Sequence, residues 1–289
     1  IVLGGVFHAA LLLLAAAGLQ LIFGVQKIVN LACGAFYALG AYTGISAAKL
    51  LFQHGWADWS LVPILICSGA LLAGIIGPLF ERILRNIYGR DEHFQLLLTF
   101  AFVLMIEDVI RFTWGAGPQQ HGTAYLAYGL ISLGQGMTIP TYNLIVICCA
   151  AAIALATGWL IQRTNFGGIV RATAENRAMA AALGVDVSRI YIYIFTLGTA
   201  LGTIGGSLAI PVSAATIDIS IEIIVDAFAV VIIGGLGSMQ GALFGALIVG
   251  LVKAAAISIY PELEMISIYL IVIAVLLVRP EGLFGKATQ

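Results

Sequence analysis

The chain has 289 residues, of which 61% are hydrophobic and only 9% are charged. A soluble domain is about half apolar and about a quarter charged, and it could not bury this excess, so we expect a polytopic integral membrane protein. The 13 basic and 14 acidic residues give a net charge of −1, which argues against a basic surface that binds nucleic acid.

Nine apolar segments follow one another, separated by charged residues and turns. In chain order they cover residues 2–23, 32–51, 61–80, 94–114, 142–161, 190–212, 223–236, 241–260 and 266–278. Continuous apolar runs are typical of membrane helices rather than of barrel strands, because a helix satisfies its own backbone groups in hydrocarbon. The sequence predicts an all-α fold with about eight or nine spans, the lower number applying if one short segment is re-entrant. We interpret residues 1–289 as one transmembrane domain.

The basic residues between these segments predict the orientation. Ten of them lie in alternate loops: Lys27, Arg82, Arg85, Arg90, Arg163, Arg171, Arg177, Arg189, Arg279 and Lys286. The opposite loops, residues 52–60, 115–141, 213–222 and 261–265, contain no lysine or arginine. Because basic loops stay on the cytoplasmic side, we expect the N-terminus outside and the C-terminus inside.

The longest cytoplasmic connection, residues 162–189, is a distinct loop within the domain. Its alanine-rich part predicts a soluble helix over residues 171–183, and Gly184 is placed to end that helix. Ala180 and Leu183 are expected to face one partner. The residues expected to face water are Glu175, Asn176 and Arg177. This helix either only links two spans along the membrane interface or docks onto a cytoplasmic partner.

Glycines and polar residues interrupt the apolar pattern at two places, residues 23–36 and 232–245. Gln26 and Asn30 in the first, and Ser238 and Gln240 in the second, can satisfy loosened backbone groups. Broken helices in corresponding halves of a membrane protein indicate a translocation pathway between the halves. Close helix packing through small residues is the alternative explanation.

A few charged residues fall inside apolar segments. Glu107 and Arg111 are four residues apart and can pair on one helix face. We expect a structural ion pair near the outer interface, with attraction of substrate as the alternative. Lys253 also needs a partner, for which Asp226 is a candidate.

The sequence carries no signature of an enzyme. Its four histidines are scattered, and Gly282–Lys286 lacks the spacing and the following hydroxyl residue of a phosphate-binding loop. We therefore expect no cofactor, no metal and no ATP site in this chain. If ATP drives transport, another subunit must bind and hydrolyse it.

Four blocks of the chain resemble one known family. They are KIVNLACGAFYALGAY (27–42), FGGIVRATAENRAMAAALGVDVSRI (166–190), AFAVVIIGGLGSMQGALFGALIVGLVKA (227–254) and LLVRPEGLFGK (276–286). In order and spacing they are similar to permeases of branched-chain amino acid ABC transporters, and the likeness covers essentially the whole chain. The GGLGS run followed by Gly241 and Ala242, and the RPEGLFGK ending, are its most specific parts.

The resemblance implies a multi-pass permease subunit of an ABC importer in the bacterial inner membrane, in contact with lipid. Its implied partners are two ATP-binding subunits, a periplasmic substrate-binding protein, and a second related permease or a second copy of this chain. Residues 171–187 would be the coupling helix. Coupling would involve Arg171, Glu175, Asn176, Ala180, Leu183 and Gly184, and the pathway would be lined by Asn30, Gly34, Gly234, Gly235, Gly237 and Ser238.

The chain departs from the family pattern in two places. The family often has Ala-His-Gly followed by an acid where this chain has Ala32, Cys33, Gly34 and Ala35, and Lys253 stands where an acid is frequent. Branched-chain amino acids are the first expectation for the substrate. Aromatic acids, other carboxylates, urea and amides are alternatives within the family. An ion-coupled secondary transporter is the alternative outside it, whereas a membrane enzyme would need a convergent nucleophile or metal set.

Overall fold

Helices make up 81% of the computed structural model, which describes residues 2–120, 128–132, 138–279 and 281–284. Each of the nine apolar segments forms one helix, and two more helices form the loop at 162–189. The helices are α1 (Val2–Gln26), α2 (Ala32–Gln53), α3 (Leu61–Leu84), α4 (Glu92–Trp114), α5 (Thr141–Arg163), α6 (Asn165–Glu175), α7 (Arg177–Ala182), α8 (Val187–Ala209), α9 (Ile219–Gly234), α10 (Met239–Ile259) and α11 (Glu264–Val278). Short 3₁₀ turns span Asp58–Ser60, Arg85–Ile87 and Pro261–Leu263. The prediction of an all-α polytopic membrane protein is confirmed.

Six of these helices are long and apolar enough to cross a membrane: α1, α2, α3 with its following 3₁₀ turn, α5, α8 and α10. At 1.5 Å per residue, α9 and α11 are only about 24 and about 22 Å long, less than the hydrocarbon thickness of about 30 Å. Helix α4 has 23 residues but carries a charged cluster in its second half. Within the described residues, length and composition thus support six spans, and the count of eight or nine stays a prediction.

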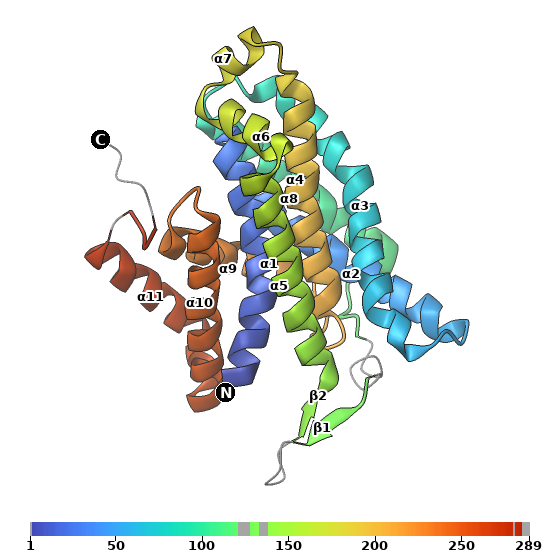
Figure 1. Ribbon diagram of the computed structural model, residues 1–289. Coiled ribbons are helices and arrows are strands. Elements are labelled where there is room, and N and C mark those ends of the chain that lie inside the picture. The colour runs from blue at the N-terminus through green and yellow to red at the C-terminus, as the bar shows by residue number, and fades with distance from the viewer. Residues whose placement is uncertain (1, 121–127, 133–137, 280, 285–289) are drawn as a thin grey trace.

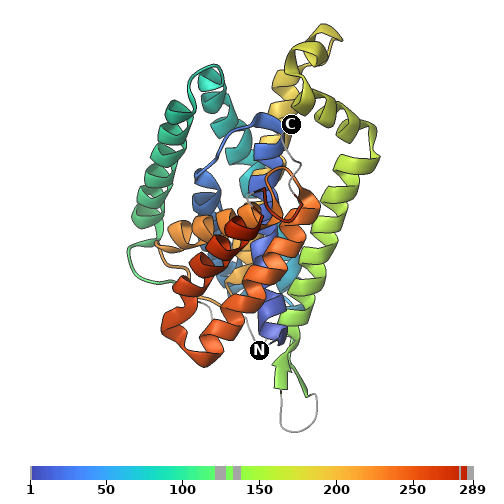
Figure 2. The same cartoon turned by 90° about the vertical axis from the view of Figure 1, so that its left-hand side faces the viewer.

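Helix α1 is the central helix of the bundle. In its most apolar stretch 83% of the residues are buried, and it packs against α5, α8, α9 and α10. Figures 1 and 2 show it enclosed between helices from both halves of the chain. The outer helices instead expose large apolar side chains, such as Leu71 of α3, Phe112 of α4 and Leu155 of α5, as a lipid-facing surface requires.

Small residues bring α2, α3 and α8 into close contact. A Cβ added to Gly69 of α3 would lie 2.9 Å from the backbone of Ile204. Two hydroxyls cross the same interface, because Thr203 donates to the Gly69 carbonyl at 2.8 Å and Ser207 donates to the Leu65 carbonyl at 2.8 Å. Close packing through small residues is therefore present here, as in many membrane bundles.

The two ends of the bundle differ. Strands β1 (Leu130–Ser132) and β2 (Thr138–Pro140) form an antiparallel hairpin, with Ile131 opposite Ile139. This hairpin and the N-terminus lie at the end opposite α6 and α7 (Figure 1), in agreement with the sides that the basic residues predict. The hairpin itself was not expected from the sequence. Lys286, one of the ten basic residues, lies outside the described residues.

Candidate functional site

The loop between α5 and α8 folds as two short helices rather than as the single helix predicted over 171–183. Thr164 caps α6 by accepting a hydrogen bond from the Gly167 N–H at 3.1 Å. Asn176 then takes an extended conformation, and its Oδ1 accepts from the Met179 N–H at 2.9 Å, so that it starts α7. The prediction of one continuous helix is wrong, because the amide of Asn176 satisfies a free N–H at the start of a new helix.

Gly184 ends α7 with a positive φ of 85°. Its N–H bonds to the Ala181 carbonyl at 3.0 Å, and the N–H of Val185 bonds to the Ala180 carbonyl at 3.1 Å. This pair of bonds is a Schellman motif, in which glycine is preferred because the residue must be left-handed. The sequence position of Gly184 therefore has a clear local reason.

The exposed and buried sides of this segment differ from the expectation. Glu175, Asn176 and Arg177 are exposed, as predicted. Leu183 is 78% exposed, whereas Ala180 is only 4% exposed and packs inside the chain. The expectation that Ala180 and Leu183 face one partner is wrong, because Leu183 is the C-cap residue beyond the end of α7 and no longer shares the buried face of Ala180.

A second hydrophobic cluster attaches α6 and α7 to the bundle. It joins Val170 of α6 and Ala180 of α7 to Leu21 and Val25 in the last turns of α1. The guanidinium of Arg171 donates to the Ile161 carbonyl at the end of α5. The segment is thus held rigidly to α1 and α5, while its exposed face stays free in this chain.

The two predicted interruptions of the apolar pattern lie side by side. The chain leaves helical structure at residues 27–31, between α1 and α2, and at residues 235–238, between α9 and α10. Gln20 of α1 donates to the Gly235 carbonyl at 2.8 Å. A Cβ on Gly24 would lie 4.0 Å from the Cα of Gly237. The break at residues 235–238 therefore lies beside the last two turns of α1, which lead into the break at residues 27–31.

The polar residues in these breaks satisfy backbone groups. Asn30 is fully buried, and its Oδ1 accepts from the Ala32 N–H at 3.0 Å. Ser238 caps α10 by accepting from the Gly241 N–H at 3.0 Å. Gly235 and Gly237 have φ of 96° and 86°, which explains why glycine occupies both positions.

The C-terminal block closes over the second break. The N–H of Leu283 donates to the Ile233 carbonyl at 2.8 Å, and the N–H of Phe284 donates to the Gly234 carbonyl at 3.1 Å. These are carbonyls at the end of α9, which a helix leaves without internal partners. Two of the sequence blocks that carry the resemblance are therefore in direct contact.

Helices α2 and α9 meet at Gly34. A Cβ there would collide with the backbone carbonyl of Ser220, so no larger residue fits without a shift of one helix. The Ser220 hydroxyl in turn donates to the carboxylate of Glu107 on α4. Glu107 is 8% exposed. The expected Glu107–Arg111 pair is wrong, because Arg111 pairs with Asp108 at 4.0 Å and Glu107 turns inward.

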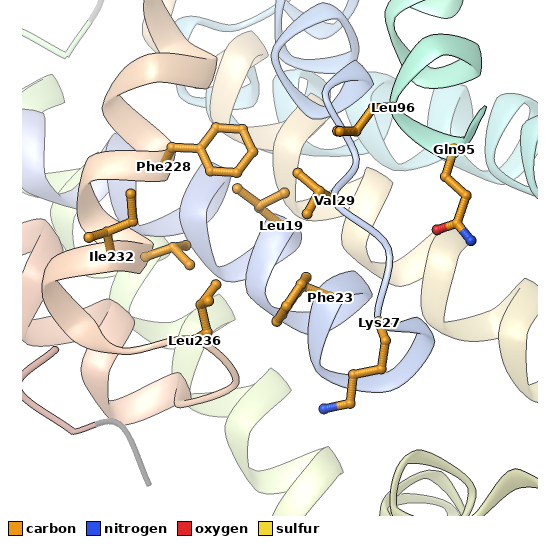
Figure 3. Close-up of a pocket in the computed structure, with 10 residues that line it drawn as sticks. Leu19, Phe23, Lys27, Val29, Gln95, Leu96, Phe228, Ile232 and Leu236 are labelled. Carbon is orange, nitrogen blue, oxygen red and sulfur yellow. The ribbon is translucent and has the colours of Figure 1, made fainter. Parts of the chain in front are cut away.

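An apolar cavity of about 520 Å³ lies beside the breaks (Figure 3). Its walls come from α1, the 27–31 segment, α4 and α9. The described lining residues are Leu19, Phe23, Lys27, Val29, Gln95, Leu96, Phe228, Val231, Ile232 and Leu236. The Lys27 ammonium, 6.0 Å from the centre of the Phe23 ring, and the Gln95 amide are the polar side chains among them.

The six residues predicted to line the pathway are not among the described residues of this cavity wall. Their neighbours in the chain, Val29 and Leu236, do line the cavity. Sequence reasoning missed Gln95 and Phe228, which come from other helices. An amide in the apolar run 94–114 was the available signal for Gln95. The roles of Asn30, Gly34, Gly234, Gly235, Gly237 and Ser238 in a pathway stay predictions.

Lys253 is the centre of a charged cluster near the opposite end of the bundle. Its ammonium lies 3.0 Å from Asp226, 2.9 Å from Glu222 and 3.0 Å from Glu264. Asp226 is therefore confirmed as a partner. The cluster joins α9, α10 and α11, and it separates a cavity of about 370 Å³ from one of about 180 Å³.

Comparisons with known proteins agree over nearly the whole chain. A family model described as "Branched-chain amino acid transport system / permease component" matches residues 1–276. The high-affinity branched-chain amino acid transport system permease protein LivH of Salmonella typhimurium is 24% identical over 280 residues, which cover 94% of this chain and 91% of LivH. The probable LivH of Methanocaldococcus jannaschii is 27% identical over 304 residues, covering 98% and 91%. The fructose import permease protein FrcC of Rhizobium meliloti is 27% identical over 267 residues, covering 86% and 72%.

Proposed function

This chain belongs to the family of permease components of branched-chain amino acid transport systems, and from this premise we propose that it forms half of the membrane pathway of an ATP-driven importer. The second half is a related permease or a second copy of this chain. Two separate ATP-binding subunits supply the energy, and a periplasmic binding protein delivers the solute. The membrane is the bacterial inner membrane, with α6 and α7 in the cytoplasm.

The observation that carries this proposal is the exposed face of α6 and α7 on a rigid attachment. Glu175, Asn176, Leu183 and Gly184 offer a surface to a partner, and Val170 and Ala180 fix the segment to α1. A free face on a flexible loop would absorb a push from a partner. A face packed onto the central helix instead transmits it, so this segment is our candidate for the coupling helix.

The lining of the cavity favours an amphipathic solute that carries a carboxylate. Its wall is mostly aliphatic and aromatic, and its polar side chains are one ammonium and one amide. A branched-chain amino acid would place its side chain on Phe228 and Ile232 and its carboxylate at Lys27. A sugar needs several hydrogen-bonding partners, and the described lining offers Lys27 and Gln95. We therefore favour branched-chain amino acids over a sugar such as the fructose in the name of FrcC.

The two adjacent breaks are our candidate for the movable part of the pathway. In the described structure the backbone N–H groups of residues 28–31 and 236–237 donate no helical hydrogen bond, so these residues can change conformation at a smaller cost than an intact helix. Asn30, Gly34, Gly234, Gly235, Gly237 and Ser238 would line the route when the cavity opens to the other side. Both breaks and the cavity belong to the single transmembrane domain that this chain contributes to the pathway.

Reconstitution tests the proposal. The chain is placed in proteoliposomes with its partner permease, the ATP-binding subunits and the binding protein, and uptake of labelled leucine is measured with ATP or a non-hydrolysable analogue. We expect uptake of leucine with ATP and no uptake with the non-hydrolysable analogue. Accumulation on an ion gradient by vesicles that contain this chain without an ATP-hydrolysing subunit would overturn the proposal. Parallel assays with fructose and benzoate decide the substrate class.

A further inference from the structure

Tyr191 of α8 connects three parts of the cytoplasmic end. Its side of the helix is buried, with the residue 6% exposed. The guanidinium of Arg177 at the start of α7 lies 5.5 Å from the centre of the Tyr191 ring. The ring of Tyr88 meets it edge-on at 5.3 Å. The Tyr191 carbonyl accepts a hydrogen bond from the side-chain amide of Gln26 at 3.0 Å.

Gln26 is the last residue of α1, and it stands at a strained point of the backbone. The next residue, Lys27, has a positive φ of 58°, the only such value for a residue other than glycine in the described chain. A left-handed backbone conformation is strained for a residue with a side chain, so it persists where its surroundings hold it. Gln26 is 8% exposed and anchored on α8, which makes it the fixed point before this turn.

The turn leads directly into the cavity wall. Lys27 and Val29 both line the cavity, together with Phe23 of the last turns of α1 (Figure 3). A small rotation of the end of α1 would therefore move one wall of the cavity. The opposite wall of the cavity is formed by residues of α4 and α9.

We propose that Arg177, Tyr191 and Gln26 form the route by which a displacement of α7 reaches the cavity. The inference rests on the proposed function, since it needs a partner that displaces α7. None of the three residues lines the cavity, so they are positioning residues. Arg177 moves with the docking segment, Tyr191 transfers the movement to α8, and Gln26 turns the end of α1 with it.

The hydrophobic cluster under α6 and α7 supports the same direction of transfer. Leu21 and Val25 of α1 pack in this cluster with Tyr191 and Ile194 of α8. The polar and aromatic contacts thus lie on a packed base rather than at a loose surface. Packed contacts of this kind shift between discrete arrangements instead of deforming gradually.

The experiment uses the complete transporter in proteoliposomes. Two quantities are measured: the moles of solute taken up per mole of ATP hydrolysed, and the ATP-dependent change in labelling of a cysteine introduced at Val29. Arg177→Met removes the cation over the ring, and Gln26→Met removes the amide donor at similar size. We expect each to lower the uptake-to-hydrolysis ratio roughly three- to fivefold, while hydrolysis and assembly of the complex continue.

Because the two residues lie on one route, the double variant should lose no more than the larger single loss. In each variant that lowers the uptake-to-hydrolysis ratio, the ATP-dependent change in labelling of the cysteine at position 29 should also be lost. Tyr191→Phe keeps the ring and the backbone carbonyl, so it should behave as the unmodified transporter. Tyr193→Phe is the matched control, because Tyr193 lies two residues away and is 57% exposed.

Independent, additive losses from Arg177→Met and Gln26→Met would overturn the route, and so would unchanged labelling at Val29. If Gln26→Met fails to assemble, Arg177→Met decides alone, because Arg177 is exposed and its loss leaves no buried group unpaired. Failure of the proposed function looks different, since the unmodified transporter would then show no ATP-dependent uptake at all.

Discussion

Lys253 of α10 and Asp226 of α9 form an ion pair of 3.0 Å between side chains that are 9% and 4% exposed. Two charges in hydrocarbon are tolerated only when they neutralise each other. Glu222 and Glu264 add partners for the same ammonium, and both are partly exposed. Together these ion pairs of Lys253 join the short helices α9 and α11 to α10.

Replacing Lys253 by methionine should be strongly destabilising. Lys253→Met leaves the Asp226 carboxylate buried without its partner, which we expect to lower the free energy of unfolding by about 3 kcal/mol. The double variant with Asp226→Asn should recover part of the loss. Reversible unfolding in detergent micelles measures both. Lys49→Met is the control, since Lys49 is exposed, and its loss should stay under about 0.5 kcal/mol. Equal losses for the two lysines would contradict the argument.

The contact at Gly34 predicts a steric effect. Gly34→Ala places a methyl group against the Ser220 backbone of α9, and we expect a loss of about 1 to 3 kcal/mol from overpacking. Gly74→Ala adds the same group on α3 where no atom lies within 4 Å, and stability should change little. Thermal unfolding of both purified variants makes the comparison. A Gly34 variant as stable as the Gly74 variant would mean that α2 and α9 do not approach this closely.

Lys27 combines backbone strain with a charge at the cavity. Lys27→Gly relieves the positive φ, whereas Lys27→Ala keeps it, so the glycine variant should be the more stable of the two, by up to about 1 kcal/mol. Both lack the ammonium, and both should take up leucine more slowly in reconstituted transporter. Glycine in an ordinary position is less stable than alanine. Finding that usual order here would show that Lys27 is not strained.

Leu183 is an exposed apolar residue at the end of α7, in the segment that we propose lies in the cytoplasm, and its exposed fraction is 78%. Leu183→Ser should weaken binding of the ATP-binding subunits about tenfold, as removal of an apolar anchor does at many interfaces. Trp56→Ser is the control, because Trp56 is 59% exposed in the loop predicted on the opposite side of the membrane. Binding is measured with the solubilised permease immobilised. Equal affinities for the Leu183 variant and the unmodified chain would remove α7 from the interface.

Local patterns in the sequence predicted the helices well, and contacts between distant residues were harder. Each apolar run became a helix, because composition alone decides whether a backbone can lie in lipid. The break at Asn176 was missed because the alanines around it favour one helix, although asparagine is a preferred N-cap. Glu107 was assigned to Arg111 on its own helix. Its actual partner, Ser220, is 113 positions away in the chain, a distance that no periodicity reveals.

The candidate site divides in the same way. The two breaks were found because glycine and amides stand out in an apolar chain. The cavity beside them was not, since Gln95 and Phe228 come from helices that meet there only in the folded bundle. Asp226 could be named for Lys253 as the nearby acid in a neighbouring span. Glu264 could not be named as a partner of Lys253, because the sequence does not show where α11 packs in the bundle.

The central place of α1 has a consequence for biosynthesis. The ribosome makes α1 before α8 and α10, the helices that later surround it. Until they arrive, lipid or the insertion machinery must cover every side of α1, which its largely apolar sequence permits. The buried amides of Gln20 and Gln26 lack their acceptors at this stage, because the carbonyl of Gly235 is synthesised 215 residues after Gln20 and that of Tyr191 165 residues after Gln26. The Gln20 amide therefore gains this acceptor only when α9 and its following turn are complete, and α10, which is made next, then encloses α1.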